Sequence, residues 1–163
     1  MGGVAERAAV SKETLYRWWS SKTEVLLEAL ADYGEQAIPI PATGSLASDL
    51  KIFMRETAAA LDQPTRRILR ILAAEAAAGE EAAREVREQF LARRRAALAA
   101  VLRPALERGE LPAEPALATV LDLVFGSLWY RLIFGTGPLD EAWADTVTSA
   151  ITSMTRQAHG EHG

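Results

Sequence analysis

The chain of 163 residues contains no cysteine and only two histidines, and these absences exclude several kinds of site. Without cysteine there is neither a disulfide framework nor a thiolate metal site. His159 and His162 lie beside Glu161 in the polar tail, which favours a solvated tail over a metal site. The serines, threonines and carboxylates of the body have no histidine partner, and no glycine-rich phosphate loop occurs. We therefore expect a protein that is not an enzyme and needs no metal or cofactor.

Strand patterns and uncharged apolar runs of membrane-spanning length are lacking as well. Alanine and leucine dominate a chain that is 49% hydrophobic, which favours helices over strands. No signal-peptide core is found at the N-terminus. The most apolar stretch, residues 116–134, contains Asp122 and Arg131, and this pattern favours a buried helix over a membrane span. We expect an all-α, cytoplasmic protein without a membrane partner.

Residues 4–28, VAERAAVSKETLYRWWSSKTEVLLE, have the pattern of a helix-turn-helix that reads DNA. Small apolar residues occupy one face of a short helix, Val10 closes the turn, and Ser11 is suited to cap the helix that follows. The outward positions of that second helix carry residue types that bind phosphates or base edges, namely Lys12, Thr14, Tyr16 and Arg17. A capping box from Ser21 to Glu24 then predicts the start of a third helix.

This stretch resembles the DNA-binding domain of TetR/AcrR-family transcriptional repressors, whose consensus sequence is close to I-A-x-x-A-G-V-S-x-x-T-L-Y-x-x-F-x-S-K-x-x-L. The matching residues are Ala5, Ala8, Val10, Ser11, Thr14, Leu15, Tyr16, Ser21, Lys22 and Leu26. The resemblance implies that Thr14, Tyr16 and Lys22 hold phosphates, that Lys12, Glu13 and Arg17 lie near the bases, and that Ser11 belongs to the same surface. Ala9 stands where the family has glycine, and the first helix of the family's domain is absent.

Charge is distributed unevenly along the chain. The net charge is −4, but residues 1–22 carry four basic and two acidic groups, so the acidic excess lies entirely in the rest of the chain. A basic head on an acidic body suits a protein that touches DNA with one end. We expect a head at residues 1–36 and a body at residues 45–158.

Proline and glycine divide the body into helices. Pro39, Pro41 and Gly44 indicate a loop, after which the chain predicts helices over residues 45–61, 64–78, 80–108, 115–134 and 140–158. Ser45 and Asp140 are the expected caps of the first and the last of these. The helix opened by Pro64 is apolar on most faces and is expected at the centre, and Pro104 is expected to kink the long helix.

The body also resembles one C-terminal ligand-binding type of the same family, in Gly109-Glu110-Leu111 followed by an apolar helix that bears Tyr130-Arg131. We expect a largely apolar pocket for a small-molecule effector. Its expected walls are Phe53, Leu72, Phe90, Phe125 and Trp129, with Glu75 and Arg131 as polar anchors. Two alternatives are open: the aromatic residues fill the core, and Glu75 pairs with Arg131 instead of with a ligand.

The last two helices are expected to form a homodimer interface. The helix over residues 115–134 is apolar around most of its circumference, and the final helix carries an apolar stripe. The expected interface residues are Leu121, Leu128, Trp143, Val147, Ile151 and Met154, and the family resemblance implies the same four-helix contact about a two-fold axis. The run from Arg93 to Arg95 favours a solvated face, balanced by Glu85 and Glu88, over a second nucleic-acid patch.

Two functions fit these patterns. The first is a ligand-responsive repressor that acts as a homodimer on a near-palindromic DNA operator. The second is a small-molecule-binding or dimerising helical protein whose DNA-binding head is defective. A gel shift with the upstream residues restored separates the two.

Overall fold

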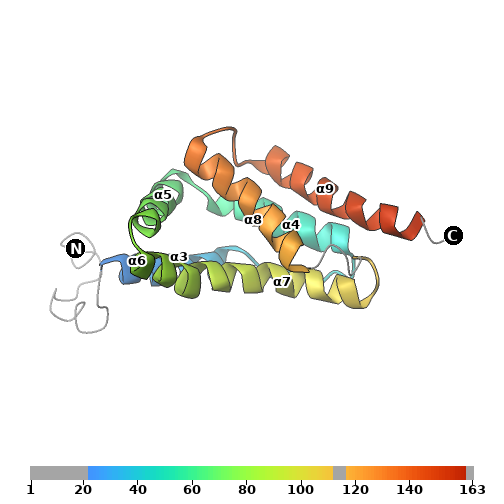
Figure 1. Cartoon of the computed structure of the whole chain (residues 1–163). Helices are drawn as coiled ribbons and strands as arrows, with labels where there is room; N and C mark the ends of the chain where they lie inside the picture. The colour runs from blue at the N-terminus through green and yellow to red at the C-terminus, as the bar shows by residue number, and fades with distance from the viewer. Residues whose placement is uncertain (1–21, 112–116, 161–163) are drawn as a thin grey trace.

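The computed structural model describes residues 22–111 and 117–160, and within these ranges every regular element is helical (Figure 1). The predicted all-α class is confirmed. In chain order the elements are α3 (Lys22–Ala37), α4 (Leu46–Ala60), α5 (Gln63–Ala78), α6 (Glu80–Glu85), the π-helical segment η1 (Val86–Leu91), α7 (Ala92–Glu107), α8 (Leu117–Phe134) and α9 (Glu141–Gly160).

Helix α4 lies at the centre of the bundle. It packs along α9 on one side and against α7 and α3 on the other. Figure 1 shows that α4 and α9 run in opposite directions, while α8 crosses the bundle obliquely between α5 and the end of α7. Helix α5 contacts α6, α8 and α3, so it covers one end of the molecule instead of its centre.

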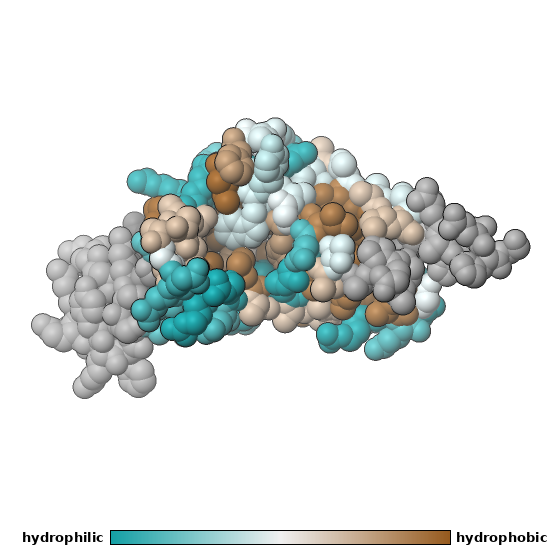
Figure 2. All heavy atoms as spheres, viewed as in Figure 1, coloured by the Kyte–Doolittle hydropathy of each residue, from teal (hydrophilic) through white to brown (hydrophobic). Residues whose placement is uncertain are grey.

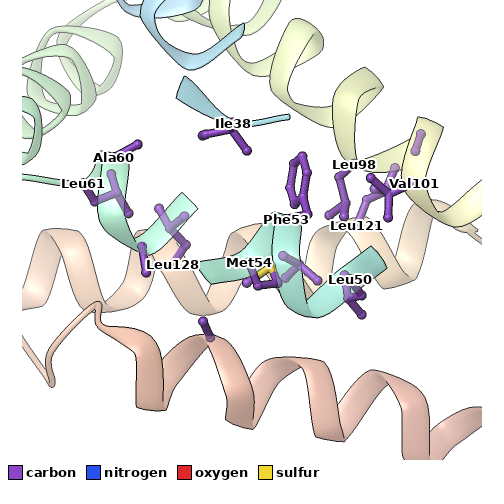
Figure 3. Packing of buried hydrophobic residues seen from close by; sticks show 14 of the residues in the cluster. Ile38, Leu50, Phe53, Met54, Ala60, Leu61, Leu98, Val101, Leu121 and Leu128 are labelled. Carbon is purple, nitrogen blue, oxygen red and sulfur yellow. The ribbon is translucent and has the colours of Figure 1, made fainter. Parts of the chain in front are cut away.

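Two neighbouring residues of α4 face opposite sides of the core. Phe53 points towards Ile38 and Leu98, whereas Met54 points away from them, towards the side that α9 covers (Figure 3). Both side chains are fully buried. A buried aromatic or long aliphatic side chain contributes about 1.5–3 kcal/mol when removed from water. The helix is therefore held from both sides by apolar contact.

The first turn of α4 is completed from the far end of α7. The Glu110 carboxylate accepts a hydrogen bond from the backbone N–H of Leu46 at 2.8 Å, while the expected cap Ser45 makes no side-chain hydrogen bond to the helix. Gly109 has φ +75°, a conformation that favours glycine and turns the chain back towards α4. The prediction for Asp140 is confirmed, because its carboxylate accepts from the backbone N–H of Trp143 at 2.9 Å.

One sequence-based expectation about the middle helices is wrong. Helix α5 is not central: it buries only Leu69 and Leu72, and Ile71 is exposed. The predicted long helix from residue 80 is confirmed as an unbroken helical run to Glu107 that includes Pro104, but within it Val86–Leu91 form the π-helical segment η1. A π-helical turn inside an α-helix is uncommon and occurs often at functional sites.

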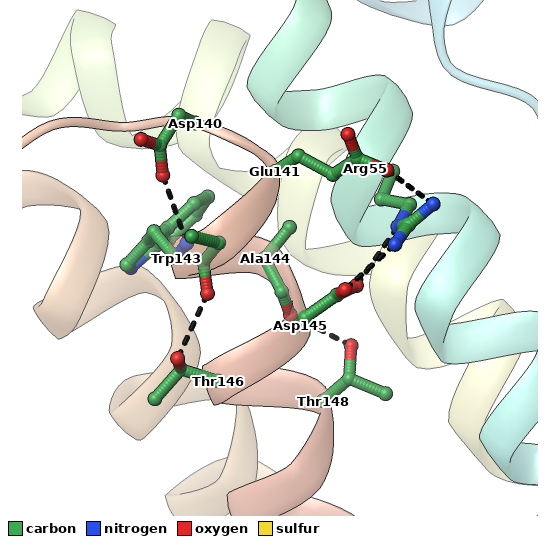
Figure 4. A network of polar contacts seen from close by, with 9 residues as sticks. Arg55, Asp140, Glu141, Trp143, Ala144, Asp145, Thr146 and Thr148 are labelled. Atoms are coloured by element: carbon green, nitrogen blue, oxygen red, sulfur yellow. Dashed lines mark hydrogen bonds and ion pairs between the residues drawn. The ribbon is translucent and has the colours of Figure 1, made fainter.

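An arginine on α4 fixes the start of α9. The Arg55 guanidinium donates to both carboxylate oxygens of Asp145, at 2.8 and 2.6 Å, and also pairs with Glu141 (Figure 4). This fork-shaped contact keeps the pKa of the Asp145 carboxyl below its ordinary value, with the hydrogen bonds from Arg55 as the main cause. The polar contact sets how α9 is aligned along α4.

Helix α8 is apolar on more faces than the bundle covers. By length and composition alone it could cross a membrane, a property that core helices of soluble proteins share. It packs against α7 and α5, and its Asp122 pairs with Arg95 of α7 at 2.6 Å. Leu123, Tyr130 and Phe134 nevertheless stay exposed on its outer side.

We expect Glu110→Gln to lower the free energy of unfolding by about 1 kcal/mol, the usual cost of losing a capping group. The bonds to Leu46 N–H and Arg108 lower the pKa of Glu110 in the folded state, so its contribution is complete above about pH 5 and is lost as the pH falls through that lowered pKa. Urea unfolding at pH 7 and pH 3 measures the effect. Glu107→Gln, at an exposed position of the last turn of α7, is the matched control.

A loss of equal size at both pH values would contradict the role of the charged carboxylate. An equal loss in the Glu107→Gln control would contradict the specific contact between Glu110 and α4.

Candidate functional site

Most of the expected DNA-contacting residues lie outside the described part of the chain. These are Ser11, Lys12, Thr14, Tyr16 and Arg17. Lys22 is the first residue of α3, whose backbone is described. Helix α3 thus directly follows the helix-turn-helix pattern and enters the body of the protein.

A cavity of about 60 Å³ lies within the body, between α3, α4, α5, η1, α7 and α8. Its walls are mostly aliphatic and aromatic. A cavity of about 150 Å³ is known to hold benzene in another protein, so a ligand of that size must widen this one. The lining residues are Leu30, Tyr33, Gly34, Ile38, Phe53, Thr57, Ala60, Leu61, Thr65, Leu69, Phe90, Leu91, Arg94, Phe125, Leu128 and Trp129.

Four of the seven expected pocket residues border this cavity, namely Phe53, Phe90, Phe125 and Trp129. Leu72 is buried in the core but does not line it. The two expected polar anchors lie elsewhere. Glu75 is exposed on α5, and Arg131 donates to the carbonyl oxygen of Pro138 at 2.7 Å, at the turn between α8 and α9.

The polar group at the cavity is Arg94, which the sequence analysis did not single out. Its neighbours in the arginine run face outward: Arg93 pairs with Asp32 and Glu35, and Arg95 with Asp122. The sequence predicted that Glu85 and Glu88 balance the charge of this run, but Arg93 and Arg95 pair with carboxylates of α3 and α8 instead. Three consecutive residues of a helix span about 200° of its circumference, so a run of three arginines reaches the covered side of any helix that is packed over more than the remaining ~160°. This spread was the signal in the sequence that could have pointed to Arg94.

Two hydroxyl groups at the cavity are already engaged. Thr57 donates to the carbonyl oxygen of Phe53 at 2.8 Å, which satisfies its hydroxyl within its own helix. Thr65 stands at the start of α5, where the Asp62 carboxylate accepts hydrogen bonds from the Thr65 side chain and, at 2.8 Å, from its backbone N–H. These contacts, the side-chain bond most of all, lower the pKa of Asp62. The cavity therefore offers apolar walls with Arg94 as its charged group.

The expected dimer residues divide into two groups. Leu121, Leu128, Trp143 and Ile151 are buried within the monomer. Val147 and Met154 are half-buried at the edge of the core. The apolar residues that α8 exposes lie on its other side, at Leu123, Tyr130, Ile133 and Phe134.

These exposed residues form one continuous face of α8. Thr119, Leu123, Gly126, Tyr130 and Ile133 follow each other at spacings of three and four residues, which places them in one row along a helix. A side chain added at Gly126 would meet no atom of the same chain within 4 Å. Figure 2 shows hydrophobic residues exposed in patches on the side of the molecule that α8 crosses.

A family model described as "Tetracyclin repressor-like, C-terminal domain" matches residues 40–151. The match covers α4 to α8 and the first half of α9, and with them most of the cavity lining.

Curated relatives and a solved structure agree with this match. The HTH-type transcriptional regulator YdeS of Bacillus subtilis is 29% identical over 152 residues, which are 93% of this chain and 77% of that protein. The HTH-type transcriptional regulator Mb1581 of Mycobacterium bovis is 30% identical over 151 residues, or 93% of this chain and 73% of the relative. The crystal structure of the TetR family transcription regulator SCO0332 superimposes with a TM-score of 0.84 at 29% identity, covering 94% of this chain and 85% of that one.

We expect Phe53→Ala to reduce the free energy of unfolding by about 3–5 kcal/mol, because it removes a fully buried ring and enlarges the cavity. The adjacent Ile52→Ala, at an exposed position of the same helix, should change it by about 0.5 kcal/mol or less. Chemical denaturation of both variants measures the difference. Similar losses in both would contradict the two-sided burial of α4.

Proposed function

Because the chain belongs to the TetR family of transcriptional regulators, a family of DNA-binding proteins that are not enzymes, we propose that it is a ligand-responsive repressor that acts as a homodimer. In this proposal residues 1–36 form the DNA-reading head, and residues 45–158 form the effector-binding and dimerisation body. It works in the cytoplasm on a near-palindromic operator.

The apolar cavity is the observation that carries the effector response. It lies in the domain that matches the tetracyclin repressor model, and α3 contributes Leu30, Tyr33 and Gly34 to its wall. Helix α3 begins where the helix-turn-helix pattern ends, so a ligand that widens the cavity pushes on the helix that connects head and body. Such a response requires that the ligand bind more tightly when α3 is in one position than when it is in another.

The outer face of α8 supports the homodimer. Monomers normally expose single, scattered apolar residues, whereas α8 exposes a contiguous row of them. Gly126 in this row leaves room for a second helix to approach closely. Two copies related by a two-fold axis would give an isologous contact and two heads in the symmetry of a palindromic site.

We predict that Tyr130→Glu and Leu123→Glu convert the dimer to monomer, because each places a charge in an apolar contact between subunits. Ile71→Glu is the matched control, since Ile71 is an exposed apolar residue of a different helix, α5. Sedimentation velocity at micromolar concentration should give about twice the chain mass of 17.7 kDa for the wild type and the control. A monomeric wild type contradicts the dimer, and dimeric α8 variants contradict this surface.

We predict that, in a protein with the upstream residues of the head restored, Lys22→Ala weakens binding to all DNA sequences about equally and reduces the salt dependence of binding by about one unit of slope, as expected for one lost phosphate contact. Arg17→Ala should instead change sequence preference, since base contacts specify and phosphate contacts position. Gel shifts on operator DNA selected from a random pool, at several salt concentrations, test both. Lys51→Ala, an exposed lysine of α4, is the control.

Unchanged binding and salt slope in Lys22→Ala would contradict the assignment of Lys22. A wild-type chain that enriches no sequence from the pool would favour the reading in which the head is defective.

A further inference from the structure

Arg94 is a buried cation with no hydrogen-bonded or ion-paired partner in the part of the chain that the structure describes. Only 7% of its surface is exposed, and among residues 22–111 and 117–160 no hydrogen bond or ion pair reaches its guanidinium. Burial lowers the pKa of Arg94 below its ordinary value, yet a guanidinium keeps its charge at neutral pH. Buried charges in proteins are normally paired, because an unpaired one loses hydration without compensation.

The surrounding carboxylates are engaged elsewhere. Glu35, the acidic residue whose charge acts on Arg94, accepts a hydrogen bond from Arg93 at 2.7 Å and makes no ion pair with Arg94. The guanidinium lies over the face of the Phe53 ring, with 5.7 Å between Cζ of Arg94 and the ring centroid. A cation–π contact of this kind compensates only part of the lost hydration.

Helix α3 makes room for this side chain at Gly34. A Cβ atom built on Gly34 would lie 3.0 Å from Nη1 and 3.4 Å from Cζ of Arg94, so any other residue would require the guanidinium to shift by a few tenths of an ångström. Gly34 lies in the last turn of α3, and glycine within a helix is less favourable than alanine. The backbone of α3 therefore approaches the buried charge closely at a position where the helix itself would prefer a side chain.

The guanidinium stands between the cavity and the surface. Arg94 lines the internal cavity together with Phe53 and Trp129, and it also lines an open groove on the outside, formed with Pro39, Ile40 and neighbouring residues. The π-helical segment η1 ends just before α7 and supplies Phe90 and Leu91 to the cavity wall. A ligand that enters from this groove would meet Arg94 before the apolar walls.

We propose that the cavity binds an organic monocarboxylate with an apolar body, whose carboxylate pairs with Arg94. This proposal rests on the proposed function, because it names the chemical class of the effector that binds in the same cavity. The planar fork of arginine matches the two oxygens of a carboxylate, and Phe53, Phe125 and Trp129 would enclose the apolar part. Binding also neutralises a charge that touches α3 at Gly34, which ties the ligand to the helix that leads to the head.

Thermal unfolding of the full chain tests this with sodium carboxylates from butanoate to decanoate and benzoate, each compared with the matching primary alcohol. We expect at least one carboxylate to raise the melting temperature of the wild type by about 2–4 °C more than its alcohol. Arg94→Met should abolish this difference. Arg94→Lys, which keeps the charge and loses the fork, should reduce it. Arg95→Met, at the exposed neighbour paired with Asp122, should preserve it.

The ligand-free variants give a second, independent readout. If Arg94 serves a ligand, Arg94→Met should melt at the same temperature as the wild type or above it, because it removes an unpaired buried charge. A lower melting temperature of ligand-free Arg94→Met, no shift with any carboxylate, or equal shifts with acids and alcohols each overturn the proposal.

Release of selected operator DNA by the same compounds separates this proposal from the proposed function. Alcohols that release DNA as well as the acids do would keep the effector site and overturn the carboxylate preference. A carboxylate that depends on Arg94 for binding and leaves DNA binding unchanged would keep the anion site and contradict the effector response.

Discussion

The burial of α4 from two sides is the constraint on which the other elements depend. Phe53 and Met54 are neighbours in sequence and leave the helix in different directions, so apolar layers are needed on both sides. Helix α9 supplies one layer, aligned by the contact of Arg55 with Asp145 and Glu141, and α3 and α7 supply the other. The cavity lies in the second layer, where side chains from several helices meet without filling the space completely.

The layer formed by α3 and α7 also contains a buried arginine that packing alone does not explain. Three adjacent arginines begin α7, and the bundle takes the outer two into ion pairs with α3 and α8 while the middle one turns inward. A buried guanidinium next to a helical glycine opposes stability on two counts. Such costs are typical of sites kept for binding, where a group is held ready for a partner that the free protein does not provide.

Helix α8 separates the cavity from the proposed subunit contact. Its inner side gives Phe125, Leu128 and Trp129 to the cavity wall, and its outer side exposes Leu123 and Tyr130. A shift of α8 would therefore change both the cavity wall and the proposed subunit contact. With α3 on the opposite wall, one ligand would contact the helix that leads to the head and the helix that faces the partner, which is the arrangement an effector response between two heads requires.

Sequence by itself determined the helical class, most helix bounds and the family, because these depend on local signals: apolar periodicity, proline and glycine breaks, and a contiguous motif. Asp140 as a cap is such a local fact. Which face of a helix is covered depends on contacts between residues far apart, so the sequence misplaced α5 at the centre and did not show that Leu121, Leu128, Trp143 and Ile151 are buried within the monomer. It found four aromatic cavity residues because large apolar side chains gather in cores. Arg94, Gly34 and the cap by Glu110 were decided only by tertiary structure, since each acts on a partner in another helix.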